Sequence, residues 1–279
     1  MSDIVLSAGV RSNLLQLQNT ADLMTTTQNR LATGKRVNSA LDNPINYFTA
    51  QGLSNRANDL SGLLDSMSTA INTIQAANNG ITSITKLVQS AQALASQAKQ
   101  TSDADTRSSL AAQFDALLTQ IDQLAGDSGF NGINLLGKKD SSDTDNDLVV
   151  TMNETGGSSI TISAVDFTTD ANGLNIGGAN ANWATLDDVK LATDDLTAAL
   201  TSLRSQAQTF GSNLSTVQIR QDFTKAMINT LQTGSDSLTL ADTNEEGANM
   251  LALQTRQQLS TTALSLASQA NQAVLRLFG

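Results

Sequence analysis

Apolar residues recur at alternating steps of four and three along five long segments of the chain, with short polar breaks between the segments. That spacing places the apolar side chains on one stripe of an α-helix, which is typical of helices that pack lengthwise on other helices. Near the N-terminus the stripe consists of Val10, Leu14, Leu17, Ala21, Met24 and Leu31. Near the C-terminus it consists of Leu259, Ala263, Leu266, Ala270, Ala273 and Leu277.

The matching stripes at the two ends of the chain allow two arrangements. Either each terminal helix packs separately on the rest of the protein, or the two pair with each other as a coiled coil; we favour the pairing. The C-terminal stretch finishes on Leu277, Phe278 and Gly279 without a polar cap. Because an exposed apolar end is unfavourable for a monomer, we expect other copies of the chain to cover Leu277 and Phe278.

Turn-forming residues separate the helical segments. Gly34 ends the first helix, and Pro44 suits the first position of a second helix that continues for roughly 50 residues at helical spacing. Residues 101–103 supply an N-cap for a third helix that folds back on the second. The last long helix begins after a cap at 185–188, and we expect it to loosen at 234–236.

The region between these helices has a different pattern. Residues 148–152 and 159–163 are rich in β-branched side chains and flank a glycine-containing turn, which predicts a β-hairpin. The sequence therefore predicts a mainly α fold, a long antiparallel coiled-coil helical bundle with both termini paired and a small β-hairpin region inserted between the helices. The expected segments are the N-terminal helix (1–42), the first part of the helical body (43–139), the β insertion (140–185), the returning helix (186–240) and the C-terminal helix (241–279).

Composition narrows the classes of function. The net charge of −10 argues against nucleic acid or an anionic membrane as the main partner, because phosphate binding needs clustered Lys and Arg. The chain has no Cys and no His, which removes disulfides, thiolate chemistry and the commonest general base. No stretch is apolar enough to span a membrane, and the N-terminus lacks the pattern of a cleaved secretory signal.

No catalytic or cofactor-binding pattern stands out, so we expect a protein that is not an enzyme and needs no cofactor. One group of acidic residues resembles a metal-binding loop. Asp143, Asp145, Asp147 and Glu154 match four ligand positions of a calcium loop. Leu148 occupies the position of the turn glycine, so a solvated acidic loop is the favoured interpretation.

Four motifs, in order along the chain, resemble those of the bacterial flagellin family. Residues 31–43 read LATGKRVNSALDN and residues 129–136 read GFNGINLL. Residues 211–220 read GSNLSTVQIR, and residues 266–277 read LASQANQAVLRL. Motifs near both ends of the chain make the resemblance specific, and only 140–185 lies outside it. The short insertion is similar to that of a small flagellin without large outer domains.

The resemblance implies a structural subunit of the extracellular flagellar filament, which serves motility. Both termini would form a paired helical layer at the filament core, and the β tip would point outward. The resemblance also implies unfolded export through the flagellar type III apparatus. The implied partners are other flagellin subunits, hook-associated and cap proteins and an export chaperone, with no nucleic acid and no membrane.

The terminal stripes provide the candidate contacts between subunits. These are Leu14, Leu17, Ala21, Met24, Leu259, Ala263, Leu266, Ala270, Leu277 and Phe278. A second family feature departs from its usual form. Many flagellins carry an Arg-Glu-Leu cluster that a vertebrate Toll-like receptor recognises, and here Gln92, Ala93 and Leu94 occupy its place. Because the Arg and Glu are missing, we expect weak receptor activation or none.

Two alternatives remain open at the level of the sequence. A hook–filament junction protein of the hook-associated type shares the terminal motifs but caps or adapts a filament instead of polymerising. A chemoreceptor signalling rod also uses heptads rich in Ala and Gln, although the predicted β tip does not suit it. Self-assembly into long filaments distinguishes a flagellin from both.

Overall fold

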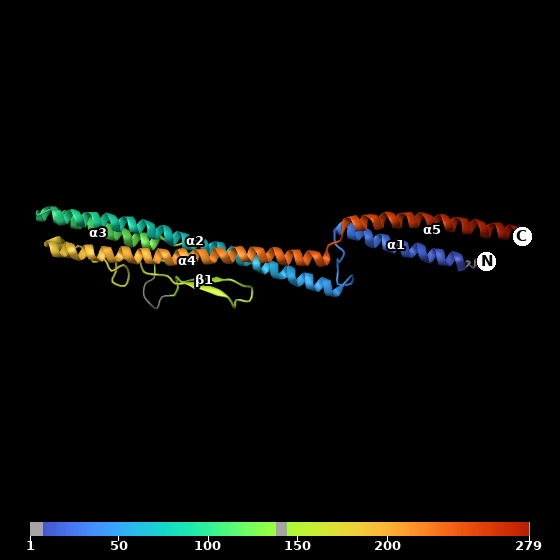
Figure 1. Cartoon of the computed structure of the whole chain (residues 1–279), viewed down its shortest axis with the longest axis horizontal. Coiled ribbons are helices and arrows are strands. Elements are labelled where there is room, and N and C mark those ends of the chain that lie inside the picture. The colour runs from blue at the N-terminus through green and yellow to red at the C-terminus, as the bar shows by residue number, and fades with distance from the viewer. Residues whose placement is uncertain (1–7, 138–143, 279) are drawn as a thin grey trace. The chain divides into compact units, whose positions relative to one another are not determined.

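The structure is a computed structural model of the 279-residue chain and describes residues 8–137 and 144–278. Five α-helices, two strands and one 3-10 turn are assigned within these ranges (Figure 1). In chain order they are α1 (Ala8–Thr33), α2 (Pro44–Gln100), α3 (Ala104–Asp127), β1 (Leu148–Thr151), β2 (Ser159–Ile162), η1 (Asn180–Trp183), α4 (Leu186–Thr239) and α5 (Thr243–Phe278). The predicted mainly helical fold with a small inserted hairpin is thus confirmed.

Contacts within the chain divide it into two compact units. We call residues 58–228 the body, and residues 1–57 together with 229–279 the terminal unit. The long helices α2 and α4 each contribute residues to both units.

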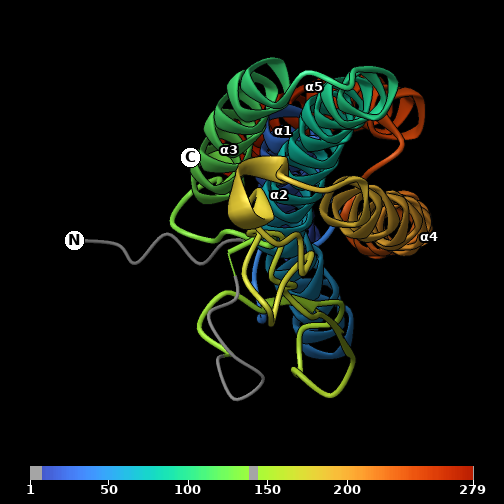
Figure 2. The same ribbon diagram turned by 90° about the vertical axis from the view of Figure 1, so that its left-hand side faces the viewer.

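The body is a three-helix bundle of α2, α3 and α4, seen nearly end-on in Figure 2. Its apolar core is continuous, and many of its large side chains are completely buried, among them Ile74, Ile84, Phe114, Leu196 and Phe210. Burying one such side chain stabilises a fold by about 1.5–3 kcal/mol. The heptad spacing of the sequence therefore produces a conventional, well-filled core in this unit.

Helix ends in the body follow from local hydrogen bonding. Asp103 is the N-cap of α3, and its carboxylate accepts a hydrogen bond from the Thr106 amide at 2.9 Å. Thr185 and Asp188 exchange hydrogen bonds at the start of α4, where the Thr185 hydroxyl donates to Asp188 Oδ2 at 2.7 Å. Both caps lie where the sequence predicts them.

The β insertion is an antiparallel hairpin in which Leu148 pairs with Ile162 and Thr151 with Ser159. The loop that follows α3 connects it to the helices, since Val165 N donates to Leu135 O at 2.8 Å. This loop lies very close to α2. A Cβ added at Gly80 would lie 2.2 Å from Ser128 Oγ, so only glycine allows the approach.

Polar side chains of α3 hold the segment that leads from the hairpin to α4. Asp122 accepts a hydrogen bond from Thr169 N, and Asp115 accepts one from Ala179 N, both at 2.7 Å. Arg107 donates from Nε to Trp183 O at 3.0 Å. These bonds fix the segment against α3, and the Trp183 ring is buried 5.0 Å from the ring centre of Phe114.

One predicted break is wrong. Gly234, Ser235 and Asp236 do not loosen α4, which continues to Thr239. The reason is packing within the terminal unit: the Ser235 hydroxyl is buried and donates to Ala50 O at 3.1 Å. Gly234 lies against the Leu53 side chain, so its missing Cβ is used for close helix packing and not for a turn.

Candidate assembly interface

The terminal unit is built around the pair α1 and α5, which lie side by side and antiparallel (Figure 1). The prediction that the two ends pair with each other is confirmed. On α1 the least exposed residues follow heptad spacing: Val10, Leu17, Thr20, Met24, Thr27 and Leu31. On α5 they are Glu246, Met250, Leu253, Gln257, Ser260, Leu264 and Ala267.

This seam is thin and partly polar. Among the α1 residues only Val10, Thr20 and Thr27 are fully buried, and two of these are threonines. Thr20 satisfies its hydroxyl within the helix by donating to Gln16 O at 2.8 Å. Because few large apolar side chains are buried, we infer that the pairing of α1 with α5 contributes much less stability than the core of the body.

The stripe predicted for α5 does not face α1. Leu259 and Leu266 are 66% and 61% exposed, and Ala263 and Ala270 are exposed as well. The residues that do contact the seam, such as Leu253 and Leu264, lie roughly a third of a turn away at 3.6 residues per turn. Helix α5 therefore carries two lines at heptad spacing, and the more apolar one, through Leu259 and Leu266, has no partner within the described chain.

On α1 the predicted stripe does coincide with the seam. Leu17, Ala21 and Met24 are partly buried on the side of α5, whereas Leu14 lies at the edge of the seam and is 40% exposed. The remaining predicted interface residues are Leu277 and Phe278. Their side chains lie outside the described part of the structure, so the burial of Leu277 and Phe278 by neighbouring copies stays a prediction.

An ion pair joins α1 to the start of α5. Arg30 Nη1 lies 2.9 Å from Glu246 Oε1, and the Glu246 side chain is only 9% exposed. Its second oxygen, Oε2, is buried without a hydrogen-bond partner among the described residues. A buried carboxylate with one unsatisfied oxygen depends strongly on the partner that it has. Arg30 and Glu246 therefore hold α5 in register with α1.

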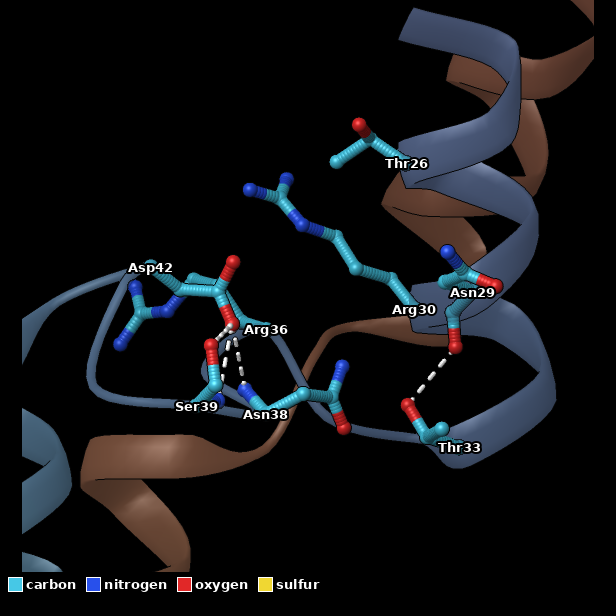
Figure 3. Close-up of a pocket in the computed structure, with 8 residues that line it drawn as sticks. All are labelled: Thr26, Asn29, Arg30, Thr33, Arg36, Asn38, Ser39 and Asp42. Atoms are coloured by element: carbon cyan, nitrogen blue, oxygen red, sulfur yellow. Dashed lines mark hydrogen bonds between the residues drawn. The ribbon is translucent and has the colours of Figure 1, made fainter. Parts of the chain in front are cut away.

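The turn between α1 and α2 borders a polar pocket of about 360 Å³ (Figure 3). Its lining residues are Thr26, Asn29, Arg30, Thr33, Arg36, Asn38, Ser39 and Asp42. Asp42 Oδ2 accepts hydrogen bonds from the amides of Asn38 and Ser39 at 3.0 and 2.9 Å. These backbone hydrogen bonds, Ser39 first, lower the pKa of Asp42 below its ordinary value.

The groups around the pocket organise the turn. The pocket's carboxylate is engaged by three groups of its own turn, two amides and the Ser39 hydroxyl. Arg30 is committed to Glu246. The turn is also tied to α4 through the backbone, because Arg36 N donates to Thr239 O at 2.7 Å. The motif at 31–43 thus forms a rigid connection between α1 and α2.

Sequence reasoning missed a second exposed apolar surface in the terminal unit. Leu41, Ile45 and Phe48 are 96%, 77% and 64% exposed. They follow one another at steps of four and three across the turn and the first two turns of α2. That spacing was available in the sequence, but the surrounding polar turn concealed it.

The other predicted positions lie in the body. Gln92 and Leu94 are partly buried and Ala93 is exposed on α2. In the proposed calcium loop, Asp143 lies outside the described residues, and Asp147 Oδ1 instead accepts a hydrogen bond from Ala164 N at 2.7 Å. Over 8–137 and 144–278, no three Asp, Glu, His or Cys side chains come together as metal ligands. In the same ranges, no helix has the length and apolarity needed to cross a bilayer.

The fold and its unpartnered α5 face define a helical structural subunit of the kind that assembles with copies of itself. The N-terminal helical region of bacterial flagellin matches residues 8–141, and its C-terminal helical region matches residues 193–278. The chain therefore belongs to the bacterial flagellin family, whose members are structural subunits of the flagellar filament. A junction protein of the hook-associated type is not favoured by these matches.

Individual relatives agree over the full length. Flagellin FljO of Caulobacter vibrioides is 27% identical, and the alignment covers 100% of this chain and 99% of that protein. A flagellin of Brucella melitensis is 28% identical with the same coverage. A crystal structure of Bacillus cereus flagellin has 21% identity and a TM-score of 0.48, covering 58% of this chain and 88% of that one.

Proposed function

We propose that this flagellin polymerises through its terminal unit, with the exposed face of α5 as a contact between subunits. The observation that carries the proposal is the exposure of the α5 line. Leu259, Ala263, Leu266 and Ala270 are all exposed and lie along one side of the helix, in a segment (257–270) without a charged residue, and the exposed Arg256 borders this line at its N-terminal end. A line of that kind on a soluble monomer is a typical protein-interaction surface.

Leu14 of α1 extends this contact surface at the edge of the seam, and Leu17, Ala21 and Met24 support it from within. Leu277 and Phe278 would continue the line towards the end of α5. A contact between two different surfaces of identical copies does not have to close into a ring, so it produces an open helical assembly. The role is structural, and the chain itself carries out no catalysis.

Assembly would also stabilise the terminal unit. The seam between α1 and α5 buries little apolar surface, and the outward face of α5 is largely exposed. Contacts with neighbouring copies would add buried apolar area at about 25 cal/mol per Å². We therefore propose that the terminal helices open readily in the monomer and become protected in the filament.

Export and the remaining partners follow from the same proposal. We propose that the chain leaves the cell unfolded through the flagellar type III apparatus, with an export chaperone, and assembles between hook-associated and cap proteins. The absence of Cys is compatible with passage through a narrow channel, since no disulfide can form on the way. A secretion assay in a strain that lacks the export ATPase tests this, and undiminished secretion there would contradict it.

Receptor recognition is proposed to be weak. Gln92 offers no guanidinium and Ala93 no carboxylate at the position of the family's receptor cluster. A bidentate, charge-assisted contact is therefore missing. A reporter-cell assay for the Toll-like receptor should show no response at nanomolar protein, and restoring Arg and Glu at Gln92 and Ala93 is the matched gain-of-function variant.

Seeded polymerisation of purified protein tests the main proposal. Leu259→Glu and Leu266→Glu each place a carboxylate on the exposed α5 face, where burial against a neighbour would leave it unpaired. Each should raise the critical concentration for filament growth at least about tenfold, which corresponds to about 1.4 kcal/mol. Gln254→Glu is the matched control, because it adds the same charge at an exposed position on the opposite side of α5. Equal behaviour of all three variants would contradict the proposal.

A further inference from the structure

We propose that Leu41, Ile45 and Phe48, here called the shoulder patch, dock onto the outward face of α5 of a second copy of this chain. This inference rests on the proposed function, because it identifies which surface of the neighbouring subunit covers α5. The two surfaces are separate parts of the terminal unit. One is a compact cluster at the start of α2, and the other is an extended line along α5.

The exposure of the shoulder patch requires a partner. Leu41 is 96%, Ile45 77% and Phe48 64% exposed, so three large apolar side chains stand in solvent within eight consecutive residues. In the body, residues of this kind are at the centre of the core. Clusters of exposed large apolar side chains are typical of protein-interaction sites. Aromatic residues are also enriched among the residues that dominate binding energies.

The patch is held in a fixed conformation before any partner binds. Asp42 fastens the turn through the amides of Asn38 and Ser39. Asn43 then starts α2 by accepting a hydrogen bond from Asn46 N at 3.0 Å. The ring of Tyr47 lies edge-on to Phe48, with 5.5 Å between the ring centres. A preorganised surface loses little conformational entropy on docking, which favours its use as a binding element.

Symmetry favours an unlike surface of the second copy, and not its own shoulder patch, as the binding partner of the shoulder patch. If the patch met the same patch of a neighbour, the contact would be isologous and would close a dimer. A filament needs a heterologous contact between two unlike surfaces. Among the described residues of the terminal unit, the outward face of α5 is an unlike surface of this kind, because its exposed Leu259 and Leu266 form an extended line.

The two surfaces have complementary shapes, because the shoulder patch carries bulky side chains and the α5 face has hollows between its leucines. Along α5 the large residues Leu259 and Leu266 alternate with the small residues Ala263 and Ala270. The alanines leave hollows between the leucines, and bulky side chains at steps of three and four fill such hollows in helix packing. Ile45 and Phe48 have that spacing. The α5 segment 257–270 and the three side chains of the patch are uncharged, whereas the exposed Arg256 and Asp42 border the two surfaces, so docking centred on 259–270 buries no unpaired charge.

A competing acceptor lies in the body. Ile219 and Phe223 are 66% and 54% exposed on α4 and are four residues apart. They form a shorter surface without small residues between them, so they offer less to a cluster of three side chains. We therefore treat them as the alternative outcome of the experiment.

Cysteine cross-linking between copies tests the proposal cleanly because the chain has no native Cys. One population carries Ile45→Cys, and a second, isotopically labelled population carries Leu259→Cys, Ala263→Cys or Leu266→Cys. Both are added as minor components to wild-type chains, so that filaments form even if a variant assembles poorly. After mild oxidation, mass spectrometry identifies which labelled and unlabelled chains are joined.

We expect disulfides from position 45 to at least one of positions 259, 263 and 266 in filaments, and none in dilute monomers. Gln254→Cys, on the opposite side of α5, should remain unlinked. Links from 45 to Ile219→Cys, links from 45 to 45, or no link at all in intact filaments would overturn the docking but leave the proposed function standing. Failure of the wild-type chain to form filaments from seeds would overturn the proposed function itself.

A charge substitution in the shoulder patch, compared with a control variant, provides a second test. Phe48→Glu should reduce the rate of filament growth at least about tenfold, because the carboxylate would be buried against α5. Gln254→Glu is the control, since it adds the same charge at an exposed position of the terminal unit that belongs to neither surface. Equal growth of the two variants would overturn the proposal. Circular dichroism of both monomers should match the wild-type spectrum.

Discussion

The body and the terminal unit use the same heptad pattern with opposite results. In the body, Ile74, Phe114 and Phe210 are completely buried in one continuous core. In the terminal unit, threonines and an ion pair line the seam, while Leu259 and Leu266 remain exposed. This difference supports the proposal that the body completes its packing alone, whereas the terminal unit completes its packing against neighbouring copies.

Deleting residues 270–279 should have the largest effect, because it should separate filament assembly from folding of the body. The deletion shortens the exposed α5 line, so filament growth from seeds should be abolished. The body should stay folded because its core lies entirely within 58–228. Electron microscopy measures the filaments, and circular dichroism measures the helical content. A deletion variant that still polymerises would show that this stretch is a local packing helix only.

A core substitution in the body should have the next largest effect, on stability. Phe114→Ala removes a completely buried ring that packs on Trp183, and it should cost about 3–5 kcal/mol of unfolding free energy. Leu259→Ala should change the monomer by less than about 0.5 kcal/mol, since its side chain is exposed. Urea unfolding followed by far-UV circular dichroism, which reports helices of both units, measures both. Comparable losses of unfolding free energy in the two variants would contradict the difference in packing between the body and the terminal unit.

Removing the cation of the α1–α5 ion pair should have an intermediate effect. Arg30→Ala leaves the Glu246 carboxylate buried without its partner and should cost the terminal unit about 1–3 kcal/mol. Arg30 is about a third exposed, so the cost lies below that of a fully buried pair. Local hydrogen exchange along α5 reports the change. In a double-mutant cycle, Arg30→Ala with Glu246→Ala should lose less than the sum of the single variants.

The smallest expected effect is a loosening of the turn at low pH. The pKa of Asp42 is lowered by hydrogen bonds that the folded turn donates, so its contribution is present above the ordinary Asp pKa of about 3.9 and is lost as pH falls below it. The amide signals of Asn38 and Ser39 should shift in NMR spectra in that range. Asp42→Asn should show no such transition, and an identical transition in that variant would assign the effect to another group.

Much of this fold could be predicted from the sequence because local signals and packing agree in most places. Gly34, Pro44 and Asp103 mark the ends of helices where the structure has them. The hairpin also lies where β-branched residues flank a glycine turn. The disagreements occur where tertiary contacts prevail, as at Gly234, whose lack of a Cβ serves helix packing instead of a break.

The candidate interface was harder to predict for a specific reason. A heptad stripe indicates that a helix has a partner, but it does not say whether the partner belongs to the same chain. On α1 the stripe faces α5, whereas on α5 the apolar stripe of Leu259 and Leu266 faces solvent, and the more polar line through Leu253 and Leu264 contacts α1. The left-handed turn at Ala181 and Asn182 was also not predicted, and it lies beside the hydrogen bond from Arg107 to Trp183 O, which joins residues far apart in the sequence.

Hydrogen exchange of the same protein as a monodisperse monomer and as a filament tests directly whether the terminal unit completes its packing only on assembly. Amides of 8–31 and 247–270 should exchange quickly in the monomer and at least about tenfold more slowly in the filament, whereas amides of the body core should be protected in both states. Strong protection of both terminal segments in the monomer would contradict the claim that the terminal unit completes its packing only on assembly.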